Sequence, residues 1–285
     1  MSESQLILNR FFSRNLFFEI VKNSNNLTYR AVIERFLKDS DCKSNGELIS
    51  EVYSYMSHNY RNEYYYQNTL LNKLLIDKHN PGSTIALTQL PVGKSKTDFV
   101  LINGKAVVYE IKTELDTFER LETQINDYYK AFDHVCLVTS PCHYKKACEI
   151  LEGSNVGIYV VSKRGAISCK YKKEPKRETS FLEHETIFKV LRKAEYESIL
   201  YDYFHELPKT TQVFYYDACF ELFRKIPINT AYKLFLAQLK KRMESEPELI
   251  SDVPFELRSL VYFSNSDKKN LTDIKEFLIQ PYRRG

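Results

Sequence analysis

Apolar and polar positions are patterned most clearly between Thr97 and Lys112, where the segment TDFVLINGKAVVYEIK holds two apolar runs around Asn103-Gly104. Apolar runs that flank an Asn-Gly pair predict two adjacent β-strands joined by a turn. Asp98 opens the first strand, while Glu110 and Lys112 stand two apart near the end of the second, so the pleat places these two on one face. A carboxylate and an ammonium inside an apolar strand are costly unless they are paired or used, which makes this hairpin the candidate for chemistry.

Helical periodicity dominates the chain before this hairpin. Residues 1–60 carry apolar positions at a spacing near 3.6, with a break at the asparagine-rich segment 23–26. A further helical pattern runs from Asn62 to Lys78 and includes a stripe of leucines suited to packing on a sheet. The segment from Thr84 to Val92 then predicts a first strand.

Both kinds of element follow the hairpin. Residues 113–132 predict an amphipathic helix, with Asp116 and Glu119 as its capping pair. The next elements are a strand, a helix and two more strands, predicted at residues 134–139, 144–151, 156–162 and 166–171.

Strand patterns disappear beyond about Ser180, and helical segments separated by Leu207-Pro208 and Ile226-Pro227 take their place. We therefore expect an α/β protein in three parts. These are a helical N-terminal region at 1–60, a sheet-containing core at 61–178 and a helical C-terminal domain at 179–285.

Composition favours an ordinary globular protein, since 285 residues with 43% hydrophobic content are enough to form a core. No apolar run approaches the roughly 20 residues that span a bilayer, and the first residues lack a signal-peptide pattern. The six cysteines form no CxxC pair, which is typical of free thiols in a reducing compartment. We expect a cytoplasmic protein with no membrane partner.

Positive charge is concentrated in one stretch. The net charge is +4, whereas residues 163–177 hold seven basic residues against Glu174 alone. Such a stretch could neutralise nucleic-acid phosphates, and it could equally be a solvated surface. The segment VGKSK adds Lys94 and Lys96 as candidate phosphate contacts close to Asp98, although it lacks the first glycine of a P-loop.

The hairpin resembles the signature of the PD-(D/E)XK nuclease superfamily, in which an acid on one strand is followed by Glu-x-Lys on the next. Here the signature reads Asp98, then Glu110, Ile111 and Lys112, and Thr97 replaces the proline. An acidic residue two before a lysine occurs five times in the chain, but only Glu110 lies within a strand pattern. The plain alternative is an edge strand whose charges face water.

The elements around the hairpin extend the resemblance. The order helix, three strands, helix, strand is similar to the αβββαβ core of the restriction-endonuclease-like fold, which implies a mixed central sheet flanked by helical N- and C-terminal regions. Gln124 and Tyr128 match the QxxxY motif of RecB-like members. Residues 109–138 also resemble a largely uncharacterised bacterial family within the superfamily, and the likeness covers about residues 60–178.

This resemblance implies a set of site residues. Those expected to be catalytic are Asp98, Glu110, Lys112, Gln124 and Tyr128. A magnesium ion, with manganese as the alternative, would be bound by Asp98, Glu110, the main-chain carbonyl of Ile111 and Glu63. Glu63 stands at the start of a predicted helix, where an acid also simply suits the helix dipole.

The leading functional hypothesis is a magnesium-dependent nuclease that hydrolyses phosphodiester bonds, with DNA as the expected substrate. The alternative is a nuclease-fold binding or regulatory module without turnover, although the intact Asp, Glu and Lys set argues against a decayed site. A third interpretation is a mainly helical protein-interaction factor, which predicts no divalent-ion binding. A homodimer is left open.

The site hypothesis also predicts the register of the hairpin. A two-residue turn at Asn103-Gly104 would pair Asp98 with Tyr109 and place Asp98 and Glu110 on opposite faces, which would refute the site. A three-residue loop or a bulge is required, so that Asp98 pairs with Glu110. We expect the three charged side chains on one face and, on the other, Phe99, Tyr109 and Ile111.

Overall fold

The chain forms two compact units in a computed structural model, and each unit is described by itself. The structure describes all residues except 1–2, 78–82, 243–249, 251, 265–267 and 284–285. The first unit combines residues 1–82, 161–167 and 244–285, and the second combines residues 83–160 and 168–243. These units group the chain differently from the three predicted parts, because segments distant in sequence pack together.

The described part of the first unit is mainly helical and also includes residues 161–167. The helix α5 (Glu63–Leu70) continues directly into a π-helical turn, η1 (Leu71–Ile76), as the leucine stripe predicts, and the predicted end at Lys78 lies outside the described residues. The other helices are α1 (Glu3–Phe11), α2 (Arg14–Lys22), α3 (Leu27–Phe36), α4 (Asn45–Asn59), η3 (Phe255–Leu257), α13 (Arg258–Phe263) and α14 (Lys268–Ile279).

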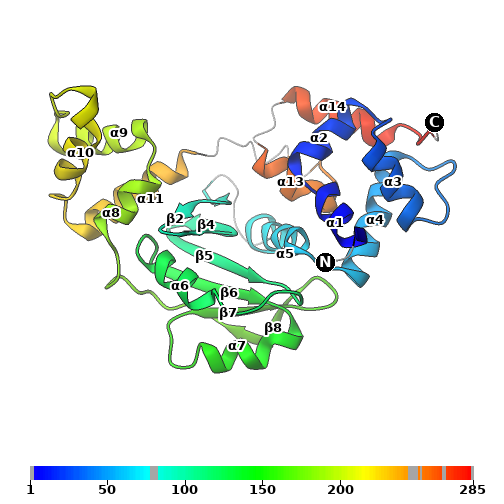
Figure 1. The fold of residues 1–285 in the computed structure, drawn as a ribbon, viewed down its shortest axis with the longest axis horizontal. Helices are drawn as coiled ribbons and strands as arrows, with labels where there is room; N and C mark the ends of the chain where they lie inside the picture. The colour runs from blue at the N-terminus through cyan, green and yellow to red at the C-terminus, as the bar shows by residue number, and fades with distance from the viewer. Residues whose placement is uncertain (1–2, 78–82, 243–249, 251, 265–267, 284–285) are drawn as a thin grey trace. The chain divides into compact units, whose positions relative to one another are not determined.

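Helix α14, to which the sequence pattern assigned no element, explains why the two ends of the chain share a unit. It packs against α2 and α4 (Figure 1). The buried Asn45 amide donates to the Phe277 carbonyl at 3.0 Å and accepts from the Tyr29 hydroxyl at 2.7 Å. Buried polar groups require such partners, so Asn45 fixes where the last helix lies.

A six-stranded mixed sheet forms the centre of the second unit (Figure 1), in the order β1-β4-β5-β6-β7-β8. The pairs β1 with β4 and β4 with β5 are antiparallel, while β5 with β6 and β6 with β7 are parallel. The strands are β1 (Ile85–Leu87), β4 (Phe99–Asn103), β5 (Lys105–Lys112), β6 (His134–Thr139), β7 (Gly157–Val161) and β8 (Ile167–Lys173). The chain therefore has a mixed α/β fold with helical flanks, and α5, β1, β4, β5, α6 and β6 follow in the predicted αβββαβ order.

Helices connect the parallel strands and complete this unit. The helix α6 (Leu121–Tyr129) links β5 to β6, and α7 (Tyr144–Ile150), preceded by the short η2 (Pro141–His143), links β6 to β7. The C-terminal helices of the unit are α8 (His184–Val190), α9 (Lys193–Phe204), α10 (Gln212–Phe223) and α11 (Ile228–Lys240). No helix in the described ranges is both long and apolar enough to cross a membrane.

The register of β4 and β5 confirms the predicted offset. Phe99 pairs with Tyr109 and Ile102 with Ala106, so extending the register by one residue sets Asp98 opposite Glu110. The turn depends on Gly104, whose φ of 68° lies in the left-handed region that glycine adopts without strain. Phe99 and Tyr109 stack edge to face at 5.9 Å, which places them together on the opposite face, as predicted.

Three local predictions were wrong. The strand expected from Thr84 to Val92 is interrupted because Gln89 adopts a φ of 56°, and β1 is followed by a separate hairpin of β2 (Pro91–Val92) and β3 (Ser95–Lys96). The helix expected at 113–132 begins only at Leu121, and the helical segment expected between Ser180 and Leu207 is divided into α8 and α9.

Asp116 and Glu119 are therefore not a helix-capping pair. The Asp116 carboxylate instead accepts hydrogen bonds from the backbone and the hydroxyl of Thr113, both at 2.8 Å, and so closes a local turn after β5. Aspartate commonly forms such turns with nearby backbone groups. Glu119 is exposed.

The even-numbered residues of β4 and β5 face the main core of the second unit. Val100 and Val108 are buried there with Leu121 and Ile125 of α6. Residues from β6, β7 and the helices α8 to α11 belong to the same apolar cluster. The charged even-numbered positions Glu110 and Lys112 therefore lie on the face that α6 covers.

A buried carboxylate ties α11 to the sheet. Asp133, which precedes β6, accepts from the Tyr232 hydroxyl at 2.6 Å and lies 2.8 Å from His134 Nδ1 and 3.1 Å from Arg177 Nε. Burial acts to raise the pKa of Asp133, but the hydrogen bonds from His134, Tyr232 and Arg177 outweigh it and hold the pKa below the ordinary value of 3.8. The ionised carboxylate is thus the form that the fold stabilises.

We expect Tyr232→Phe to lower the free energy of unfolding by about 1–3 kcal/mol, because it leaves a buried carboxylate short of a donor. The lowered pKa of Asp133 means that its stabilisation is present above pH about 4 and is lost as the pH falls through the folded-state pKa. The difference between wild type and variant, measured by urea unfolding, should therefore shrink in acid. A difference that grows in acid would contradict this role for Asp133.

Candidate active site

The predicted site residues of the second unit come together at the end of β5. The hairpin register brings Asp98 beside Glu110, and the strand period places Lys112 on the same face. Helix α6 follows β5 in the chain, and its residues Gln124 and Tyr128, four apart, lie on the side of the helix that faces these charges.

Glu110 and Lys112 form a buried ion pair with 2.7 Å between Glu110 Oε1 and Lys112 Nζ. Their side chains are 2% and 11% exposed. Lys112 Nζ also donates to Gln124 Oε1 at 2.9 Å. A buried pair is tolerated when additional hydrogen bonds satisfy its remaining donors and acceptors, and Gln124 supplies one of them.

Tyr128 satisfies the other oxygen of Glu110. Its fully buried hydroxyl lies 2.6 Å from Glu110 Oε2 and 2.7 Å from the Lys96 carbonyl, so its single proton is shared between two acceptors. Burial, and then the negative charge of Glu110, raise the pKa of Tyr128 well above its ordinary value. The phenol therefore stays protonated at neutral pH and acts as a donor.

Asp98 is half-buried and belongs to the same group through the backbone of β5. Its Oδ2 accepts from the Ile111 N–H at 2.7 Å. In an extended strand the N–H and C=O of one residue leave on the same edge, so the Ile111 carbonyl also points to the edge that bears Asp98. The two carboxylates and this carbonyl are the predicted oxygen ligands from the second unit.

These oxygens fit a magnesium ion better than a zinc ion. An ionised carboxylate has about four acceptor positions, so the hydrogen bonds from Lys112 and Tyr128 to Glu110 leave room for a cation. Within the described part of the chain, no three His, Cys, Asp or Glu side chains gather where they could hold a metal. A cation here would thus depend on two carboxylates, a carbonyl and water, which suits magnesium because it retains several waters, whereas zinc takes a closed set of nitrogen and sulfur ligands.

The remaining predicted ligand, Glu63, belongs to the first unit. It is exposed in the first turn of α5, where a negative charge suits the helix dipole. Its place among the metal ligands stays a prediction.

The basic stretch at 163–177 is more structural than its composition suggests. Lys173 Nζ donates to the Ser154 carbonyl at 2.8 Å beyond the end of α7, Lys172 pairs with Glu174, and Arg177 binds Asp133. Strand β8 is also separated from β5 by two strands, or about 14 Å at the usual spacing. These pairings favour the interpretation as surface over that as a phosphate site beside the acids.

Two polar residues that the sequence analysis missed support the site. The buried Thr139 hydroxyl, at the end of β6, donates to the Lys112 carbonyl at 2.7 Å. Asp127, buried in α6, accepts from Lys94 N and Ser95 Oγ of the β2–β3 hairpin. Asp127 stands directly before Tyr128. An acid on the apolar side of a predicted helix was the sequence signal that could have identified it.

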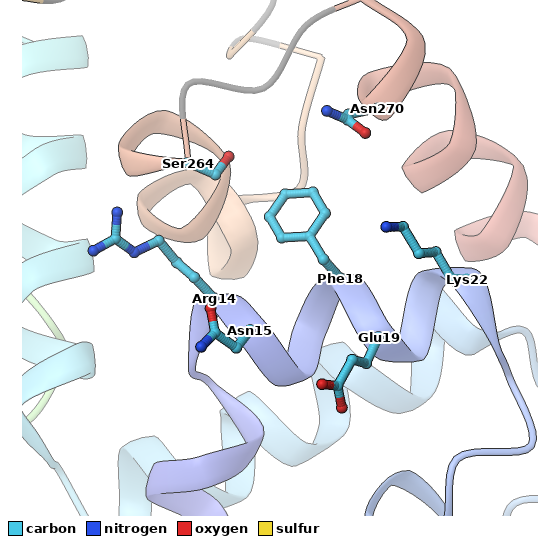
Figure 2. A pocket seen from close by; sticks show the side chains of 7 residues that line it. All are labelled: Arg14, Asn15, Phe18, Glu19, Lys22, Ser264 and Asn270. Atoms are coloured by element: carbon cyan, nitrogen blue, oxygen red, sulfur yellow. The ribbon is translucent and has the colours of Figure 1, made fainter.

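A pocket of about 530 Å³ within the first unit has a different character. Figure 2 shows Phe18 and Lys22 on the side of α2 that faces Ser264 and Asn270, with Arg14 at the start of the helix. Arg14 there donates to the Phe263 carbonyl. Among the described residues that line the pocket, Glu19 is the single acid, so they do not include paired carboxylates like those of the candidate site.

Comparison with known proteins gives a family. The model of the family described as bacteriophage P4 protein cII matches residues 56–254, which is well over half of the chain. The chain belongs to this family. The cII family match includes α5, the whole sheet and α8 to α11, and therefore every candidate site residue. No curated protein and no solved structure matches the chain.

We expect Lys112→Met to lower the free energy of unfolding by about 3–5 kcal/mol in the presence of a chelator, because it leaves Glu110 buried and unpaired. The double variant with Glu110→Gln should recover much of this loss, since the neutral amide is cheaper to bury. Urea unfolding measures both. Lys105→Met, an exposed lysine at the start of the same strand, is the matched control and should change stability by less than about 0.5 kcal/mol. Equal effects at the two lysines would refute a structural ion pair.

Proposed function

We propose that this member of the cII family is a magnesium-dependent nuclease that hydrolyses phosphodiester bonds, with DNA as the expected substrate. The observation that carries the proposal is the group of Asp98, Glu110 and Lys112 on one face of a hairpin, joined by Gln124 and Tyr128 of α6. Ionisable groups whose pKa is shifted by burial and by a charged partner gather preferentially at functional sites, and Tyr128, whose pKa burial and Glu110 raise, is such a group.

The arrangement suggests a role for each side chain. Lys112 supplies a positive charge where negative charge develops on the attacked phosphate, and Gln124 holds its ammonium in place at 2.9 Å. Tyr128 holds the Glu110 carboxylate in one orientation, and the Ile111 N–H does the same for Asp98. Preorganised groups of this kind need little rearrangement during a reaction.

In the proposed hydrolysis, the oxygen of a water molecule attacks phosphorus, and the bond from phosphorus to the leaving sugar oxygen breaks. The water gives up a proton, and the leaving oxygen takes one. A magnesium ion bound by Asp98, Glu110 and the Ile111 carbonyl would lower the pKa of its water and stabilise charge on the phosphate.

The direct test is incubation of the protein with linear, circular and branched DNA and with RNA, in magnesium or manganese, beside a chelator control. We expect metal-dependent cleavage, and a loss of more than about 100-fold in Asp98→Asn, since even indirect partners of a metal ligand affect activity by about 10- to 100-fold. The carboxamide oxygen of this variant can still accept from the Ile111 N–H, so the fold should survive.

Asp116→Asn is the matched control, because this neighbouring acid after β5 is engaged with Thr113 and should leave cleavage unchanged. Cleavage by Asp98→Asn at the wild-type rate would refute the site. Nucleic-acid binding without any cleavage would instead favour the alternative of a binding or regulatory module.

A further inference from the structure

We infer that the β2–β3 hairpin is a binding element for the phosphate backbone of a nucleic acid, with Lys94 and Lys96 as the contacts and Asp127 as the residue that positions them. This inference rests on the proposed function, since it concerns the substrate of the same site. It is a statement about binding and can therefore be tested apart from hydrolysis.

The hairpin is firmly held on its apolar side. Pro91 pairs with Lys96 and Val92 with Ser95, while Leu90 and Val92 are buried in the core of the second unit. Strand β2 packs against α8, and β3 packs against α6. The hairpin is therefore a fixed support for whatever its exposed side chains contact.

Its turn is fitted closely to α6. Gly93 has a φ of 61°, and a Cβ atom there would come within 2.7 Å of Asp127 Oδ1. Only glycine permits this approach without displacement. Asp127, 8% exposed, accepts from the Lys94 N–H at 3.1 Å and from the Ser95 hydroxyl at 2.8 Å. The buried Asp127 carboxylate thus accepts hydrogen bonds from Lys94 and Ser95, the two residues that come directly before Lys96.

The two lysine side chains of the hairpin are exposed to solvent. Lys94 and Lys96 flank Ser95, which is buried against Asp127. Within the described ranges neither ammonium forms an ion pair, in contrast to Lys172 and Arg177 of the more basic stretch. An exposed, unpaired ammonium on a fixed backbone is the arrangement that binds phosphate with little ordering cost.

The hairpin is joined directly to the acid cluster. Lys96 stands two residues before Asp98, so their Cα atoms are at most about 7 Å apart. The Tyr128 hydroxyl lies within hydrogen-bond distance of both the Lys96 carbonyl and Glu110. A backbone phosphate held at the cluster would therefore place its neighbours along the strand within reach of the two lysines.

The test is the salt dependence of binding to a short fluorescent oligonucleotide, single-stranded DNA, duplex DNA or RNA, in chelator so that no cleavage occurs. We expect Lys94→Ser with Lys96→Ser to weaken binding and to lower the slope of log affinity against log salt by about 1.4–1.8 between about 50 and 200 mM, as loss of two phosphate contacts requires. The oligonucleotide for which the salt slope changes most identifies whether the hairpin recognises single-stranded DNA, duplex DNA or RNA.

A matched double variant, Lys170→Ser with Lys176→Ser, removes two exposed lysines from the basic stretch and should leave the slope unchanged. Asp127→Ala should weaken binding, whereas Asp127→Asn, which retains an acceptor for Lys94 N and Ser95 Oγ, should restore it. Melting temperatures monitor folding of each variant.

Equal changes of the salt slope in the two double variants would show a simple effect of net charge and would overturn the inference. A wild-type protein that binds none of the oligonucleotides would also overturn it. Cleavage is scored separately with Asp98→Asn. If the Lys94→Ser, Lys96→Ser variant binds normally, this inference is overturned. If Asp98→Asn has at the same time lost cleavage, the proposed function still stands.

Discussion

The buried ion pair of Glu110 and Lys112 is the interaction on which the arrangement of the second unit depends. Two charges inside a sheet face are unfavourable unless they are paired with each other and supported by further hydrogen bonds. Here the ammonium reaches Gln124, and the second carboxylate oxygen reaches Tyr128. Both partners come from α6, so this helix must lie over the end of β5 with one particular side inward. Apolar packing alone would allow α6 to slide or rotate more freely than these polar contacts do.

The hairpin and the periodic side of α6 could be predicted from the sequence because local pattern specifies them. Alternation fixes which residues of β5 share a face. The resemblance to the nuclease signature, which requires Asp98 to meet Glu110, then selects one register among the possible turns. Gln124 and Tyr128 were selected by their match to the QxxxY motif, and helical spacing then places them on one side of α6. Once these residues are named, their geometry needs only neighbours in the chain, together with one cross-strand pairing.

Other features depend on contacts that no local pattern contains. Asp116 resembles a helix cap in sequence but bonds to Thr113, and α6 starts five residues later. In sequence the basic stretch at 163–177 resembles a solvated surface. In the structure Lys173 donates a hydrogen bond to the Ser154 carbonyl beyond the end of α7. Likewise, α14 joins the N-terminal helices through Asn45, more than two hundred residues away. Composition and periodicity describe what a segment can do, whereas its partners are decided by tertiary packing.

Helix α6 links the acid cluster to the β2–β3 hairpin through two consecutive residues. Successive helical side chains point about 100° apart, so Asp127 reaches the turn of the hairpin while Tyr128 reaches its last carbonyl and Glu110. A displacement of α6 that broke one of these contacts would strain the other, because both act on the same short hairpin. Asp98, Glu110 and the lysines of the β2–β3 hairpin are thereby held in one body. The family match spans all of these residues, so the linkage lies within the part of the chain that the cII family shares.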